Sequence, residues 1–220
     1  MPKEIAPRES ELILVRHGET DSNAQDVWQG MQGDDPLNER GRLQSLAVAD
    51  YLTRYSPVKA LYSSDLRRAI ETAEMIGVQL NLPVKMHTGL REYDFGFLEG
   101  ATTSEAQGRW HELLDRWRSE PTYKPHGGES AFDFAVRVNG AFQEILAQHP
   151  TGRVIVVAHG GSLSIGLAVL VGEPQRWQAY QMSNCSVTIV AMKPRPTIAA
   201  FEETSHLVDI GTATWGGAGL

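Results

Sequence analysis

Hydrophobic residues along this chain gather in short continuous runs instead of alternating strictly with polar ones. The runs with the length and β-branched content of strands cover residues 12–15, 58–63, 84–87, 153–159 and 186–192. Between them, apolar residues recur at helical spacing over about 39–54, 65–79, 105–118, 130–148 and 162–171. Near-continuous apolar strands that alternate with helices are typical of a mostly parallel sheet covered on both faces. The pattern therefore predicts an α/β fold.

The chain has the length of one sizeable domain, since it contains 220 residues with no internal repeat, low-complexity tract or convincing linker. We expect a single domain over residues 1–220, with its core at about 11–208. Glycine, proline and polar residues make 119–129 the most loop-like stretch. The glycine-rich residues 209–220 are predicted to form a mobile tail.

The charge balance limits the partners of the protein. A formal net charge of −7 gives no overall attraction for nucleic acid or an anionic membrane, so we expect neither as a partner. The N-terminus does not resemble a signal peptide and no apolar run could cross a bilayer, which favours a cytoplasmic protein. The sequence does not decide between a monomer and a homo-oligomer.

Metal and disulfide chemistry find little support in the composition. Cys185 is the only cysteine, which excludes an intrachain disulfide. The seven histidines share no spacing typical of a metal site, so we predict neither a metal nor another cofactor.

Two predicted strands end in histidine. The first runs into Arg16 and His17, and the strand at 153–159 ends in His159, with glycine directly after each histidine. The carboxyl ends of parallel strands meet at one edge of a sheet, where ligands of such folds bind. We expect these residues to converge there, with the glycines allowing sharp turns and close approach of a ligand.

A third strand contributes arginine to the same edge. The stretch "LYSSDLRRA" passes into a helix that we expect to be capped by Ser64 or Asp65, with Arg67 and Arg68 in its first turn. The N-terminus of a helix attracts anions and disfavours cations. An arginine at this place is therefore best explained by a bound anion.

Five motifs occur in a fixed order: "LVRHGET", "SSDLRRAIETA", "LREYDFGFLEG", "HGGES" and "VVAHGGSL". Together they resemble the histidine phosphatase superfamily, in its phosphoglycerate mutase-like branch, over residues 11–208. The resemblance implies a three-layer α/β/α fold with a Rossmann-like, mostly parallel sheet, in agreement with the hydrophobic pattern.

The resemblance also implies catalytic roles. His17 would be the nucleophile that forms a phosphohistidine, and Arg16 and Arg67 would hold the phosphoryl oxygens. His159 would be a second imidazole that stabilises charge on the transferred group. Glu92 would protonate the leaving alcohol and later activate water. The simpler alternatives are strand-end histidines in ordinary hydrogen bonds and a surface carboxylate at Glu92.

Further phosphate-pocket positions follow from the same resemblance. They are Thr20, Asn23, Gln29, Gly30 and, after the second histidine, Gly160. Side-chain amides and backbone N–H groups suit an anion. Ordinary loop capping is the alternative for the first four.

The reaction that the resemblance implies is hydrolysis of a small phosphomonoester. A cofactor-dependent phosphoglycerate mutase is the first alternative, and a non-catalytic module that binds a phosphorylated ligand is the second. The segment "FGFLEG" resembles the phosphatases, and the compact stretch 101–130 lacks the longer basic insertion of those mutases. The sequence therefore favours a phosphatase and does not identify its substrate.

Overall fold

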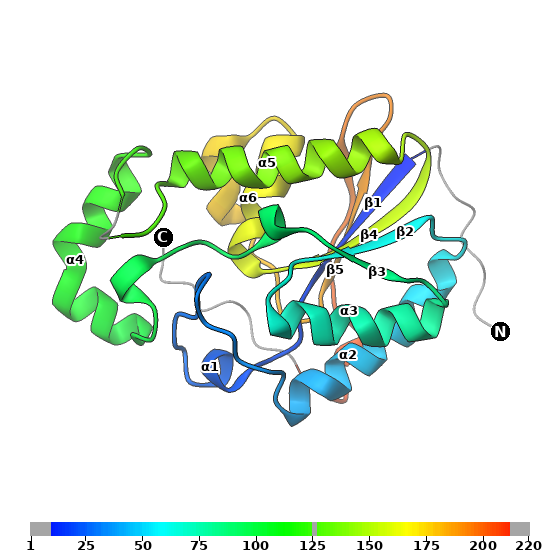
Figure 1. The fold of residues 1–220 in the computed structure, drawn as a ribbon, viewed down its shortest axis with the longest axis horizontal. Helices are drawn as coiled ribbons and strands as arrows, with labels where there is room; N and C mark the ends of the chain where they lie inside the picture. Colours follow the sequence, from blue (N-terminus) through cyan, green and yellow to red (C-terminus); the bar gives the residue numbers. More distant parts are fainter. Residues whose placement is uncertain (1–9, 125–126, 212–220) are drawn as a thin grey trace.

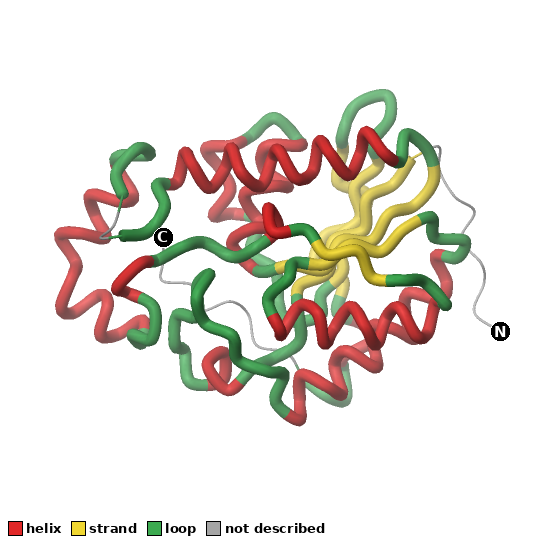
Figure 2. The backbone as a smooth tube through the Cα atoms, in the orientation of Figure 1, coloured by secondary structure: helices red, strands yellow, loops and turns green. Residues whose placement is uncertain are grey.

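A computed structural model describes residues 10–124 and 127–211. Its centre is a six-stranded sheet with the strand order β3-β2-β4-β1-β5-β6. Figure 2 shows the strands in the middle of the molecule with helices on both sides. The strands are β1 (Ser10–Arg16), β2 (Ala60–Ser63), β3 (Val84–Met86), β4 (Gly152–Ala158), β5 (Val187–Ala191) and β6 (Thr197–Glu203).

Helices form the two outer layers. The α-helices are α1 (Asp21–Ala24), α2 (Glu39–Leu52), α3 (Arg67–Leu80), α4 (Thr103–Ser119), α5 (Ala131–Gln148) and α6 (Gly160–Leu170). Short 3₁₀ turns are η1 (Thr53–Tyr55), η2 (Thr88–Leu90), η3 (Gly96–Leu98), η4 (Pro174–Ala179) and η5 (Ser205–Leu207). Helices α2 and α3 cover one face of the sheet, α5 and α6 cover the other, and α4 lies at one end of the molecule (Figure 1). The predicted three-layer α/β fold is confirmed.

The central strands contain unbroken apolar runs, 12–15 in β1 and 154–158 in β4, because both faces of the sheet are covered. On β1, Leu12 and Leu14 belong to one core, while Ile13 and Val15 belong to the other. The same division holds on β4, where Val156 and Val157 pack on opposite faces. This alternation accounts for the unbroken apolar runs in the sequence.

The strand order brings the two histidine motifs together. Strands β1 and β4 are parallel neighbours in the middle of the sheet, with Arg16 opposite Ala158. His17 and His159 therefore leave the same edge of the sheet on adjacent strands. Strands β5 and β6 run antiparallel at the other side. The sequence patterns missed β6, whose residues are all exposed or only partly buried because it is an edge strand.

The start of the predicted tail is bound to the domain. The carbonyl oxygen of Gly211 accepts a hydrogen bond of 2.8 Å from Nε2 of Gln44, a fully buried side chain of α2. The remainder, 212–220, lies outside the described residues. Within the described part of the chain, no helix has the length and apolar character needed to span a bilayer.

Candidate active site

His17 lies buried directly after β1, and its hydrogen bonds determine which ring nitrogen carries the proton. Nδ1 is 2.7 Å from the carbonyl oxygen of Gly18. Since a carbonyl oxygen only accepts, Nδ1 carries the proton, and the lone pair on Nε2 accepts a hydrogen bond of 3.3 Å from Nε of Arg68. Burial, together with the nearby Arg68 and Arg16, lowers the pKa of His17 well below its ordinary value. The imidazole is therefore neutral near pH 7, the form that can act as a nucleophile.

His159 has the opposite tautomer. Its Nδ1 accepts a hydrogen bond of 3.1 Å from Nε of Arg68, so the ring proton sits on Nε2 and is donated to Oγ of Ser64 over 2.8 Å. Burial and then Arg68 hold the pKa of His159 well below its usual value. The two rings lie 5.1 Å apart between centroids. The unprotonated nitrogen of each ring faces the same Nε–H group of one arginine.

That arginine is Arg68, and this corrects the sequence prediction of Arg67. The side chain of Arg68 is buried between the histidines, and its Nε lies 3.3 Å from Nε2 of His17. Arg67 lies outside this cluster, with its side chain 54% exposed and its Nε donating to Glu71 over 2.8 Å.

The error came from the phase of the helix. Neighbouring helical residues point about 100° apart, so only one of two adjacent arginines can face the sheet. Arg68 shares the buried face of α3 with Thr72 and Ile76, whereas Arg67 is in phase with Glu71. The spacing of Ala69, Thr72 and Ile76 in the sequence carried this signal.

Ser64 and Asp65, the two residues predicted to cap α3, make other contacts. Helix α3 begins at Arg67 with Leu66 at its N-cap position, not with Ser64 or Asp65. The hydroxyl of Ser64 accepts from His159, as described above, and Asp65 pairs with Arg91 at 2.6 Å. Ser64 therefore orients the imidazole of His159.

Arg16 is the second buried guanidinium of the site. Its Nη1 donates to the carbonyl oxygen of Met182 at 2.9 Å, while its buried Nε has no hydrogen-bond partner among the described residues. Burial lowers the pKa of Arg16 to about 10, opposed chiefly by the carboxylate of Glu92. A buried donor without a partner is costly, and an anion would supply the missing acceptor.

Glu92 is buried at the N-terminus of α6. Its Oε2 accepts from the N–H of Gly161 at 2.9 Å, and its Oε1 accepts from the N–H groups of Ser162 and Tyr93 at 3.1 and 2.9 Å. Burial lowers the pKa of Arg68 to about 10, and Glu92 is again the main opposing charge. The carboxylate thus belongs to the same electrostatic cluster as both arginines.

Two glycines of the histidine motifs are required by close packing. A Cβ atom on Gly161 would lie 2.4 Å from Oε1 of Glu92, and one on Gly18 would lie 2.4 Å from the carbonyl oxygen of Gly41 on α2. Neither glycine has a positive φ angle. A sharp turn is the prediction for Gly18, the glycine directly after His17, whereas Gly18 needs to be glycine because a helix backbone approaches it closely. Gly161, the second glycine after His159, is required because a carboxylate approaches it.

Gly30 meets the cluster through its backbone. Nη2 of Arg68 donates to the carbonyl oxygen of Gly30 at 2.8 Å, and Nη1 donates to that of Gly33 at 2.6 Å. Gly30 has a φ angle of +60°, and a Cβ atom there would overlap the carboxylate of Glu99. That carboxylate accepts from the N–H of Met31 at 3.0 Å. The loop is therefore fixed against the site from two sides.

The remaining predicted residues form a hydrogen-bonded group beside α1. Oγ1 of Thr20 accepts from the N–H of Asn23 at 3.1 Å and from Nε2 of Gln29 at 2.8 Å. Gln29 also donates to Oδ2 of Asp35 at 2.9 Å. A hydrogen bond from the Ser22 hydroxyl is the main cause that lowers the pKa of Asp35. Gly160, the last of the predicted residues, is the first residue of α6 and is buried.

Neutral imidazoles, buried arginines and a carboxylate within one cluster suit transfer of a phosphoryl group. The guanidinium groups neutralise its charge, and the lone pair on Nε2 of His17 is available for bond formation. Within residues 10–124 and 127–211 no group of three or more His, Cys, Asp or Glu side chains could hold a metal ion.

Curated relatives share most of their length with this chain. A glucosyl-3-phosphoglycerate phosphatase from Mycobacterium tuberculosis is 37% identical over 217 residues, which is 94% of this chain and 96% of the relative. A metal-independent phosphoserine phosphatase from Arabidopsis thaliana is 35% identical, with 92% and 85% of the two chains covered.

A solved structure and a family model agree with these relatives. The native structure of the mycobacterial glucosyl-3-phosphoglycerate phosphatase superposes with a TM-score of 0.80 at 32% identity, covering 90% of this chain and all of that one. The model of the histidine phosphatase superfamily (branch 1) matches residues 12–202. Those residues include every member of the cluster built around His17, and the chain belongs to the histidine phosphatase superfamily.

Proposed function

We propose that this phosphatase hydrolyses its substrate through a phosphohistidine on His17. The cycle begins with Glu92 in its protonated, carboxylic acid form. In the first step Nε2 of His17 bonds to phosphorus, the ester P–O bond breaks, and the leaving oxygen takes the proton of Glu92, which becomes a carboxylate. In the second step Glu92 accepts a proton from water, whose oxygen attacks phosphorus while the P–N bond breaks. The released product is inorganic phosphate, and both His17 and Glu92 return to their initial states.

The positive groups hold the phosphoryl oxygens during both steps. Arg16 and Arg68 supply charge-assisted hydrogen bonds. The negative charge of the bound phosphate favours uptake of a proton from water by Nδ1 of His159, which then donates to a phosphoryl oxygen in place of accepting from Arg68. The observation that carries this proposal is the fixed tautomer of His17, whose Nδ1 bond to Gly18 leaves the unprotonated Nε2 facing the Nε–H group of Arg68.

The names of the relatives suggest a substrate class. Phosphoserine and glucosyl-3-phosphoglycerate both carry a phosphate ester on the primary alcohol of a three-carbon carboxylic acid, with a variable group at the middle carbon. We extend this class to the present chain. The variable group distinguishes the two substrates, so its binding site would set the specificity.

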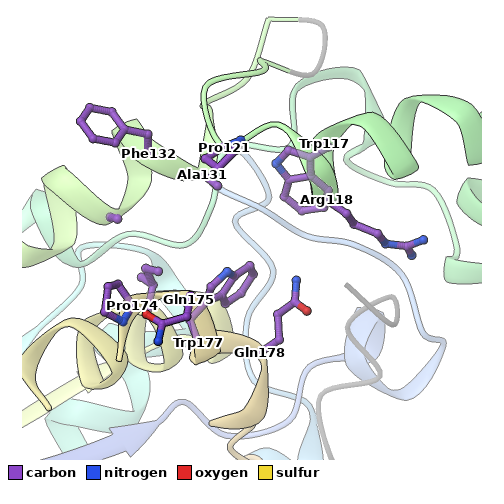
Figure 3. A pocket seen from close by; sticks show the side chains of 11 residues that line it. Trp117, Arg118, Pro121, Ala131, Phe132, Pro174, Gln175, Trp177 and Gln178 are labelled. Atoms are coloured by element: carbon purple, nitrogen blue, oxygen red, sulfur yellow. The ribbon is translucent and has the colours of Figure 1, made fainter. Parts of the chain in front are cut away.

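A cavity between α4, the start of α5 and η4 offers room for that group. Its volume is about 420 Å³, and Figure 3 shows Trp177 and Gln178 of η4 on the opposite side from Trp117 of α4. The indole N–H of Trp117 donates to the hydroxyl of Tyr93 at 2.5 Å, next to Glu92 in the chain. The aromatic rings and the amide suit an organic group that carries hydroxyls.

A panel of phosphomonoesters tests the function. We expect phosphate release from phosphoserine and from substituted 3-phosphoglycerates at higher kcat/KM than from glycerol 3-phosphate, which lacks the carboxylate. Conversion of 3-phosphoglycerate to 2-phosphoglycerate is measured alongside. Isomerisation faster than phosphate release would identify a mutase instead, and no turnover of any ester would favour a binding module.

A further inference from the structure

Asn184 connects the proposed nucleophile to a distant part of the site. It lies in the turn between η4 and β5, and its side chain is fully buried. Its Nδ2 donates to the backbone carbonyl oxygen of His17 at 2.9 Å and to Oδ1 of Asn23 at 3.2 Å. The contact with Asn23 joins residues 161 positions apart in the chain.

The carbonyl oxygen of His17 determines the direction of these bonds. Because that oxygen only accepts, the NH₂ group of Asn184 must face it, and the same NH₂ group can meet only the oxygen of the Asn23 amide. Oδ1 of Asn23 also lies 3.3 Å from the N–H of Thr20. Two donors therefore face Oδ1, and the Nδ2 atom of Asn23 lies on the other side of its amide.

Asp35 determines how the side-chain amide of Gln29 is oriented, on the other side of Asn23 from Asn184. Its ionised carboxylate only accepts, so the NH₂ group of Gln29 faces it at 2.9 Å and uses its second hydrogen on Oγ1 of Thr20. Oε1 of Gln29 then lies 3.5 Å from Nδ2 of Asn23. Both N–H groups of the Gln29 amide are therefore occupied. Asn23 uses one N–H group on Gln29 and has a second N–H group that can bind a ligand.

We propose that Asn184 is a positioning residue that, together with Gln29, orients the amide of Asn23 so that one N–H group of Asn23 points at the bound phosphate. This inference rests on the proposed function of the site. It also gives different roles to two residues predicted from the sequence to line the phosphate pocket. Asn23 contacts the phosphate, whereas Gln29 acts through Asn23.

A double-mutant cycle on phosphate affinity tests the coupling. The variants are Asn184→Ala, Asn23→Ala and the pair, and the Kd of inorganic phosphate is measured by calorimetry, which needs no turnover. Loss of a hydrogen bond to a charged ligand costs about tenfold or more in affinity, so we expect each single variant to raise Kd by about that factor. The pair should raise Kd no further than Asn23→Ala alone, within about twofold.

Two further variants separate positioning from damage to the turn. Asn184→Ser keeps a polar side chain in the turn but lacks the Nδ2 atom that makes both contacts, so it should raise Kd as Asn184→Ala does. Ser186→Ala alters a buried neighbour in the same turn and should leave Kd and the melting temperature unchanged.

Additive effects in the pair, or an unchanged Kd in Asn184→Ala, would overturn the positioning role. The proposed function fails separately, if the unaltered protein binds phosphate but releases none from any ester.

Discussion

The Nε–H group of Arg68 lies 3.3 Å from Nε2 of His17, so one guanidinium directly faces the proposed nucleophile. The adjacent Arg67 gives a matched control, since it lies on the same helix with its side chain largely in solvent. Arg68→Lys should lower kcat/KM by about 100-fold or more, because an ammonium group cannot replace several directed guanidinium bonds. Arg67→Lys should change it less than about threefold. Similar losses in both variants would mean that the buried arginine has no special role.

The carboxylate of Glu92 has two proposed duties with different demands on the leaving group. Glu92→Gln keeps the shape and cannot donate a carboxylic proton, so it should slow phosphoenzyme formation strongly with an alkyl phosphate. A nitrophenolate leaves without help, and formation from nitrophenyl phosphate should slow much less. Single-turnover formation is the quantity to measure, because the later dephosphorylation also loses its base. Equal slowing with both esters would assign Glu92 to positioning, and Glu99→Gln would then be examined.

Activity should not depend on a metal ion. Arg16 and Arg68 bring two positive charges to the place where Mg²⁺ acts in other phosphoryl-transfer enzymes. Dialysis against EDTA should therefore leave kcat within about twofold, a change too small to signal loss of a catalytic group. A large loss that one divalent ion restores would disprove this prediction.

Both imidazoles should make folding sensitive to acid. The pKa values of His17 and His159 are lowered in the folded protein, so below about pH 6.5 the unfolded chain binds protons that the folded protein does not. The free energy of unfolding should then fall as the pH drops from about 7.5 to 5.5, with a slope of up to about 1.4 kcal/mol per pH unit for each histidine. The variant His17→Asn with His159→Gln should show a shallower slope in denaturant titrations. An identical slope would mean that neither histidine is kept neutral by the fold.

Local patterns predicted those parts of the molecule that local chemistry determines. The apolar runs located four strands whose residues are almost all buried, β1, β2, β4 and β5, and also the exposed edge strand β3. A motif of consecutive residues marked His17 and its neighbour Arg16. To choose between Arg67 and Arg68, one must know which of them lies on the buried face of α3. The spacing of apolar residues along α3 gives that information, whereas the motif alone does not.

Other features depend on contacts that no local pattern records. Strand β6 is an edge strand with weak burial, so its apolar signal is faint. The bond from Asn184 to Asn23 joins two loops across the fold, and the donors of Gln29 are occupied by Thr20 and Asp35 only once the loop has folded. Contacts of this kind follow from tertiary structure alone.

The central claim is the covalent bond between phosphorus and Nε2 of His17. Brief mixing with a ³²P-labelled phosphomonoester, followed by a rapid quench, should trap label that is stable in base and lost in acid, as expected for a phosphorylated imidazole. Peptide mapping under alkaline conditions should place it on His17, and His17→Ala should show none while its melting temperature stays close to that of the unaltered protein. Label on His159, on a serine, or on no residue during active turnover would contradict the account.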